Sequence, residues 1–344
     1  MSIESHQLIL STSPYIKPPV DTPGIMRHVI YALTPACLAA VYYFGIAAIL
    51  VIAAAIAGAF LTEWLSQREV PSEVKSIRDW SAVVTGLLLA LTLPPGIPLW
   101  MAFFGGVVAI ALGKLVFGGL GQNIFNPSLV GRAFLQASFP VALTTWSPLR
   151  SLSSFGQLPE HTFTFPFLKG TVDAVTAATP LAQMKFEHKA PALLDLLLGN
   201  TAGSLGETSA VLLLLGGLYL IVRQFMNWRI PLAIFASVFV FGGIFHLVDA
   251  AKYPAPWLHL FSGGLVLGAV FMATDPVTSP VTQLGCYLFG AGIGLLVVMI
   301  RLFGGLPEGV MYAILLMNGV TPLLNRTTYA RIYGGKRPSL AARE

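Results

Sequence analysis

Residues 46–65 read IAAILVIAAAIAGAFLTEWL, and this stretch decides which kind of fold the chain can form. Glu63 is its only charged residue. As an α-helix rising 1.5 Å per residue, a segment of this length spans the roughly 30 Å hydrocarbon core of a bilayer. Such a helix has no broad polar face to turn toward water. The stretch therefore predicts a membrane-spanning helix.

The composition of the whole chain agrees with this prediction. Of its 344 residues, 55% are hydrophobic and only 10% are charged, and the mean hydropathy is +0.76. An average soluble domain has roughly 25% charged residues. A net charge of +5 then reflects membrane topology and not nucleic-acid binding. The two cysteines, Cys37 and Cys286, are too few to ligate an iron–sulfur cluster within this chain.

Windows of about 19 residues with high hydropathy predict ten transmembrane helices. We place them near residues 25–45, 46–65, 81–94, 98–117, 128–143, 207–226, 229–247, 257–274, 281–303 and 307–324. The third and the fifth are shorter than the roughly 20 residues that a full crossing needs. Short spans interrupted by glycine or proline often line a cavity.

The two halves of the chain carry similar motifs in the same order. Thr85-Gly86-Leu87 leads through a proline turn to Gly118-Gly119-Leu120, and Ser262-Gly263-Gly264-Leu265 leads through another to Gly304-Gly305-Leu306. Five spans per half is an odd number, so true repeats would insert with opposite topology. The alternative is that glycine and proline turns recur by chance. We expect an all-α polytopic membrane protein with about ten transmembrane helices in two inverted five-helix repeats with short broken helices.

This organisation divides the chain into five parts. They are a cytoplasmic N-terminal tail (1–24), the first repeat (25–143), an extracytoplasmic loop (144–206), the second repeat (207–324) and a cytoplasmic C-terminal tail (325–344).

The orientation follows from the positive-inside rule. With both termini inside, the cytoplasmic segments carry Lys17, Arg27, Arg68, Lys75, Arg78, Arg132, Arg223, Arg229, Arg326, Arg331, Lys336, Arg337 and Arg343. The short outer loops hold only Lys252 and Arg301. The remaining cations lie in the loop of residues 144–206, which is too long to count under the rule.

That loop contains Asp173-Ala-Val-Thr-Ala-Ala-Thr-Pro-Leu181. A threonine hydroxyl can be esterified with phosphate, and the small Ala177 and Ala178 leave room for a bulky planar group or a modifying enzyme. Asp173 is suited to holding a metal or the hydroxyl during such a transfer. From the residues alone, the ordinary interpretation is a polar loop with an alanine-rich turn.

The stretch resembles the flavin-attachment motif of the Rnf and Nqr respiratory complexes. In that motif Asp, two arbitrary residues, Ser or Thr, Gly or Ala, and Ala precede a threonine that carries FMN through a phosphoester bond. The matching positions here are Asp173, Thr176, Ala177, Ala178 and Thr179. Ala177 stands where glycine is commonest, which bears on how efficiently the site is modified.

Five further motifs resemble the Rnf D subunit in order across nearly the whole chain. They are Ile25–Pro35 (IMRHVIYALTP), Ser81–Pro95 (SAVVTGLLLALTLPP), Gly118–Pro127 (GGLGQNIFNP), Met272–Pro280 (MATDPVTSP) and Tyr329–Gly334 (YARIYG). The related B subunit of the sodium-pumping quinone reductase shares several of these motifs but usually has a longer N-terminal extension.

The resemblance implies an electron-carrying membrane subunit of a bacterial inner-membrane complex that couples ferredoxin:NAD⁺ electron transfer to translocation of Na⁺ or H⁺. It implies covalent FMN on Thr179 at the periplasmic side, which makes the chain a flavoprotein and a phosphoprotein. The implied partners are the other Rnf subunits (A, B, C, E and G), a flavin transferase that installs the FMN, and the lipid bilayer. No nucleic-acid partner is expected.

Polar residues in the membrane motifs are the other site candidates. Asn123, Asn126, Thr274 and Asp275 lie in two loops that the repeat would bring to equivalent places on the cytoplasmic side. In the family, these regions are linked to a second, non-covalent flavin (riboflavin or FMN) or to the ion path. For Asp275-Pro276, helix termination with a cap is the alternative.

Two charged residues fall within predicted spans. Lys114 is either a functional charge or a snorkelling one that reaches the interface. We expect Glu63, near the inner end of its span, to have a capping or interfacial role.

Two other classes of function stay open. An inverted repeat with paired broken helices is also a transporter architecture, so a solute channel or transporter without a redox cofactor is one alternative. A scaffold protein with a vestigial flavin site is another.

Overall fold

The computed structural model describes residues 21–68, 76–147, 155–156, 158–159, 162–165, 178–187, 191–207, 209–250, 252–305 and 307–329. All regular secondary structure in these ranges is helical. The first half contains α1 (Thr22–Phe44), α2 (Ile46–Ser66), η1 (Ser76–Asp79), α3 (Ser81–Leu91), α4 (Leu99–Ile110), η2 (Ala111–Leu115), α5 (Pro127–Ser138) and α6 (Pro140–Thr144). Between the halves lie α7 (Pro180–Ala182), η4 (Gln183–Glu187), α8 (Leu193–Leu198) and η5 (Leu205–Glu207). The second half contains α9 (Ala210–Val222), α10 (Arg229–Val248), α11 (Pro256–Phe261), α12 (Leu265–Leu267), η6 (Gly268–Met272), α13 (Gln283–Phe303) and α14 (Val310–Thr328).

Four of the described helices are long and apolar enough to cross a membrane: α1, α2, α10 and α13. Shorter apolar helices cover residues 81–91, 99–115 and 210–222. The chain is therefore a helical membrane protein, as its composition predicts. Each predicted span coincides with one or more helices of the structure.

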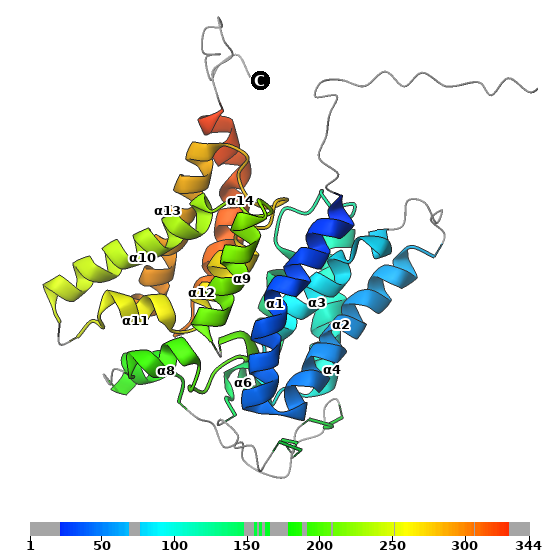
Figure 1. The fold of residues 1–344 in the computed structure, drawn as a ribbon, viewed down its shortest axis with the longest axis horizontal. Helices are drawn as coiled ribbons and strands as arrows, with labels where there is room; N and C mark the ends of the chain where they lie inside the picture. The colour runs from blue at the N-terminus through cyan, green and yellow to red at the C-terminus, as the bar shows by residue number, and fades with distance from the viewer. Residues whose placement is uncertain are drawn as a thin grey trace, which may run out of the picture.

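The helices form two groups that follow the order of the chain (Figure 1). Helices α1 to α4 lie together, and α9 to α14 lie beside them (Figure 1). Within the first group α2 packs along α4, and within the second α10 packs along α13. Helix α1 packs against α9, which joins the two groups along their boundary.

Glycines set how closely α2 and α4 approach. A Cβ atom on Gly106 of α4 would overlap the carbonyl oxygen of Ala55 and lie 2.8 Å from the amide nitrogen of Ala59. A Cβ atom on Gly58 of α2 would overlap the carbonyl oxygen of Phe103. Such contacts let backbones pack directly, which is the main way apolar helices associate in lipid.

Two predicted continuous spans are broken in the structure. The span near 128–143 is interrupted at Phe139, between α5 and α6. The span near 257–274 is interrupted between Phe261 and Leu265, where Gly263 adopts a positive φ of 67°. Only a residue without Cβ takes that conformation without strain. The break directs the backbone carbonyls around Ser262 toward neighbouring side chains.

Two arginines counted in loops by the positive-inside argument are buried instead. That argument places Arg132 on the cytoplasmic side and Arg301 in a short outer loop, but both side chains lie inside the helical body. Each is held by polar partners from other elements. Neither therefore contributes to the charge asymmetry of the loops.

We predict that Gly106→Ala destabilises the protein, because the added methyl group must push α2 and α4 apart. Overpacking of this kind costs about 1–3 kcal/mol, which exceeds the roughly 0.5–1 kcal/mol that a helical Gly→Ala change gains. The measurement is thermal unfolding of the detergent-purified protein. The matched control is Gly243→Ala in α10, where nothing lies within 4 Å of the added carbon. Equal melting temperatures for the two variants would contradict the prediction.

Candidate functional site

Two cavities contain the described candidate residues. Ala178 and Thr179 line one, which we call the threonine cavity. Asn123, Asn126 and Thr274 line the other, which we call the loop cavity. Asp173, Thr176 and Ala177 lie outside the described residues, so their predicted roles stay predictions.

The threonine cavity has a volume of about 410 Å³. Its described lining comes from α5, α6, the α7–η4 segment and the start of α14, and comprises Arg132, Gln136, Leu143, Thr144, Trp146, Ala178, Thr179, Ala182, Phe186, Pro307, Glu308, Met311 and Tyr312. The volume falls in the range of roughly 300–1,000 Å³ that is typical of small-molecule sites. Three aromatic rings in one lining suit a planar ligand, because flat rings stack.

Thr179 occupies the N-cap of α7, and its Oγ accepts a hydrogen bond of 3.2 Å from the backbone N–H of Ala182. The residue is 6% exposed. Pro180 follows at the first helical position, where its missing N–H costs nothing. An ester oxygen keeps lone pairs, so Thr179 can retain this contact when a phosphate is attached to it. The local sequence Thr-Pro thus fixes the hydroxyl on the cavity wall.

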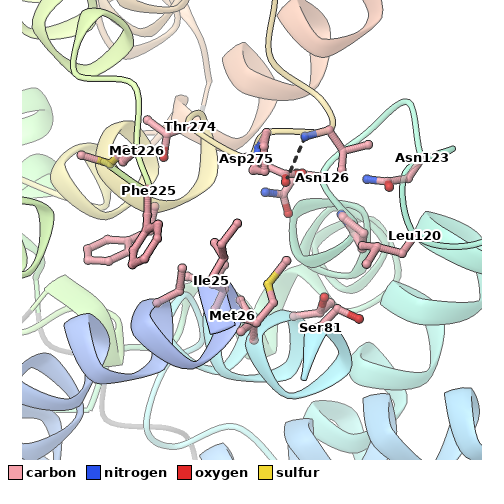
Figure 2. Close-up of a pocket in the computed structure, with 18 of the residues that line it drawn as sticks. Ile25, Met26, Ser81, Leu120, Asn123, Asn126, Phe225, Met226, Thr274 and Asp275 are labelled. Carbon is pink, nitrogen blue, oxygen red and sulfur yellow. Dashed lines mark hydrogen bonds between the residues drawn. The ribbon is translucent and has the colours of Figure 1, made fainter. Parts of the chain in front are cut away.

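The loop cavity lies where the two halves meet and has a volume of about 90 Å³. Asn123, Asn126 and Asp275 approach it from one direction, and Phe225 and Met226 from another (Figure 2). Ile25 and Met26 of α1 add further apolar surface. The predicted meeting of the two polar loops is confirmed by this shared cavity.

The two asparagines differ in how their amides are used. Asn126 caps α5 through Oδ1, which accepts from Ser128, and its Nδ2 donates 3.1 Å to the carbonyl oxygen of Met272 in the second half. Asn123 donates from Nδ2 to the carbonyl oxygen of Phe125. Its Oδ1 is buried and has no hydrogen-bond partner among the described residues. A buried unpaired acceptor in a cavity is suited to a ligand donor or a cation.

Asp275 caps the loop that follows η6. Its carboxylate accepts from the backbone N–H of Val277 at 3.4 Å and from the hydroxyl of Thr278 at 3.3 Å. Burial raises the pKa of Asp275 to about 6, although these two hydrogen bonds oppose the shift. The capping interpretation is confirmed, but the residue also lines the loop cavity. One side chain therefore fits both interpretations of Asp275-Pro276.

Lys114 forms a buried ion pair with Glu63. Lys114 Nζ lies 2.6 Å from Glu63 Oε1 and donates to Ser81 Oγ at 2.7 Å, and the two charged side chains are 1% and 0% exposed. Snorkelling is therefore excluded for Lys114, and the interfacial role expected for Glu63 is wrong. Lys114 lies in the π-helical turn η2 and lines the loop cavity together with Ser81. Its charge is part of the protein interior.

Helix α5 connects the two cavities. Asn126 and Pro127, at its start, line the loop cavity, and Gln136, near its end, lines the threonine cavity. Twelve helical residues extend about 18 Å. The flavin-motif threonine and the asparagine loop thus lie at opposite ends of one helix.

Sequence reasoning missed Arg132 and Glu308 as site residues. Arg132 Nη2 donates 2.5 Å to Glu308 Oε2 on the wall of the threonine cavity, across 176 positions of sequence. Such a distant pairing has no local signal. An arginine within an apolar span was the available signal, because intramembrane charges usually pair inside a bundle.

Comparison with known proteins extends these observations. The model of the NQR2, RnfD, RnfE family matches residues 9–334. The D subunit of the proton-translocating ferredoxin:NAD(+) oxidoreductase complex of Clostridium ljungdahlii is 43% identical over 345 residues, covering 97% of this chain and 98% of the relative. The D subunit of the Na(+)-translocating ferredoxin:NAD(+) oxidoreductase complex of Acetobacterium woodii is 43% identical and covers 95% of both chains. The D subunit of the ion-translocating oxidoreductase complex of Halorhodospira halophila is 39% identical, over 95% of this chain and 96% of the relative.

We predict that Lys114→Met lowers stability by about 3–5 kcal/mol, because Glu63 is left as a buried charge without its cation. The double variant Lys114→Met/Glu63→Gln should recover much of this loss. Thermal unfolding of the two variants and the unchanged protein measures the difference. A double variant no more stable than the single one would show that the pair is not the cause.

We also predict a carboxylic acid that titrates near pH 6 in the loop after η6. Below this pKa Asp275 is protonated and neutral, and above it the carboxylate carries its charge. Infrared difference spectra recorded from pH 5 to pH 7 should show the protonated C=O band disappear with a midpoint of about 6. The band should be absent in Asp275→Asn and unchanged in Asp249→Asn. An unchanged titration in Asp275→Asn would contradict the assignment.

Proposed function

Because the chain belongs to the NQR2, RnfD, RnfE family, we propose that it is the D subunit of an Rnf-type complex, an ion-translocating ferredoxin:NAD⁺ oxidoreductase. Relatives that match it over nearly their full length carry that name. It is an electron-carrying subunit of an oxidoreductase and not an enzyme on its own. The observation that carries its role is Thr179 on the wall of an aromatic cavity.

The cofactor in this proposal is FMN joined by a phosphoester to Thr179. Three features support the fit: a fixed threonine oxygen, the small neighbour Ala178, and a cavity with Trp146, Phe186 and Tyr312 in its lining. A bound flavin supplies reversible uptake of electrons. The chain's own residues fix its attachment point, surround its ring and limit its contact with water. Asp173, Thr176 and Ala177 complete the motif that a flavin transferase would recognise.

The loop cavity is the proposed place for either a second, non-covalent flavin or a station on the ion path. Its apolar walls, with Ile25 and Phe225, suit a flavin ring, and the amides of Asn123 and Asn126 suit the polar edge of that ring. Its volume of about 90 Å³ is small for such a ring unless Met26 and Met226 move. Asp275 and Lys114 are the charges that an ion would meet there.

The proposed membrane arrangement has about ten spans in two inverted repeats. Two structural correspondences support it: α2 packs on α4 as α10 packs on α13, and each half has a buried cation near the end of the corresponding helix, Lys114 and Arg301. Both termini are placed in the cytoplasm of a bacterial cell and the Thr179 loop on the periplasmic side of the inner membrane. The partners are the Rnf subunits A, B, C, E and G, and the transported ion is Na⁺ or H⁺.

The alternative function, a channel or transporter without a redox cofactor, uses the same helical architecture. It gives no role to a threonine held in an aromatic cavity. The chemistry of Thr179 therefore separates the two functions, and it also tests the vestigial-site scaffold.

We predict that the full-length protein, made in a host with the flavin transferase, gives a fluorescent band under ultraviolet light after denaturing electrophoresis. Thr179→Val removes the ester oxygen and should abolish the band. The matched control is Thr144→Val, which lines the same cavity and should keep it. A dark band from the unchanged protein would reject covalent flavin and favour the channel or scaffold.

A further inference from the structure

The ion pair between Arg132 and Glu308 lies on the wall of the threonine cavity and joins the two halves of the protein. Arg132 projects from α5, and Glu308 stands just before α14. Arg132 Nη2 donates 2.5 Å to Glu308 Oε2, and Nη1 donates 2.8 Å to the carbonyl oxygen of Thr92 at the end of α3. Two donors with fixed acceptors hold the guanidinium plane in one orientation.

The pair supplies the charge of this cavity. Among the described lining residues, Arg132 is the only cation and Glu308 the only anion. Their side chains are 7% and 19% exposed, so water screens them little. Charges in such surroundings interact far more strongly than charges in water. Any charge that develops on a molecule in the cavity therefore meets the Arg132 guanidinium with little screening.

Two further charged residues lie around Glu308 besides Arg132. Arg301 of α13 and Glu207 of η5 both interact electrostatically with Glu308. Arg301 is itself fixed, because it donates to the carbonyl oxygens of His259 at 2.5 Å and Ser262 at 2.9 Å. Glu308 is thus shared between two arginines. It only partly neutralises Arg132, which leaves positive potential toward the cavity.

We propose that Arg132 stabilises the reduced, negatively charged form of the flavin attached to Thr179, and that Glu308 is the positioning residue that orients Arg132. This inference rests on the proposed function. Two electrons from a reduced partner subunit and one proton from water convert the neutral oxidised ring into a reduced ring with one negative charge. No bond to the protein forms or breaks in this step. The guanidinium is in place before the charge appears, so it stabilises that charge without reorganising.

The two members of the pair should act in opposite directions on the flavin. Removing the cation in Arg132→Gln destabilises the reduced anion and lowers its midpoint potential. Removing the carboxylate in Glu308→Gln leaves the arginine uncompensated and raises the potential. A purely structural role for the pair would shift both variants in the same direction, because both break the same contact.

The test is a redox titration of the covalent flavin in the full-length protein, purified from a host that contains the transferase. We expect Arg132→Gln to shift the ratio of reduced to oxidised flavin at least tenfold toward oxidised, which is about 30 mV for a two-electron couple. Glu308→Gln should shift it toward reduced, and Arg132→Lys should lie between Arg132→Gln and the unchanged protein. The control Arg229→Gln removes an arginine that does not line the cavity and should leave the potential unchanged.

The outcomes separate this inference from the proposed function. If the unchanged protein carries no covalent flavin, both are overturned. If the flavin is attached but Arg132→Gln and Glu308→Gln leave its potential unchanged or shift it in the same direction, only the role of Arg132 is overturned. If Arg132→Gln does not fold, the sign of the Glu308→Gln shift decides, because a zero or downward shift contradicts the proposal.

Discussion

The fold depends on one constraint, which is that a charge buried among apolar helices must have a partner. Placing a lone ion in such surroundings costs several kcal/mol, and the cost falls only when an opposite charge and hydrogen bonds meet it. Lys114 meets Glu63 and Ser81, and Arg132 meets Glu308. Each pair joins elements that are distant in sequence. The pairs therefore fix which helices can pack together, α2 with the α4–η2 helix and α5 with the start of α14.

The breaks in the helices serve the same constraint. An unbroken helix uses its carbonyl oxygens internally, so it has few to offer a neighbouring arginine. Because α11 ends at Phe261 and Gly263 turns the backbone, the carbonyl oxygens of His259 and Ser262 become acceptors for Arg301. Irregular backbone at membrane depth is tolerated when protein buries it in this way. The interruption thus allows a buried cation, and the cation stabilises the interruption.

The sequence predicted the helical class and the helix positions well, because hydropathy is a local property of 20-residue windows. It also predicted that the Asn123 and Asp275 loops would meet, since the repeated motifs imply it. The partner of Glu63 was beyond reach, because Lys114 lies 51 positions away and no local pattern connects them. The same holds for Arg132, which a rule about loop charges assigned to the wrong place. The break at Ser262 was missed as well, because the hydropathy of the window stays high across it.

Helix α5 gives the two cavities a common wall, and this has a structural consequence. The helix is tied to the second half at its start by Asn126, which donates to the carbonyl oxygen of Met272, and farther along by Arg132, which pairs with Glu308. A third contact, from Arg132 to the carbonyl oxygen of Thr92, ties it to α3. A short helix moves as a rigid body, so a change in one tie alters the geometry at the other. The loop cavity and the threonine cavity are therefore not independent sites, because the same helix positions polar groups in both.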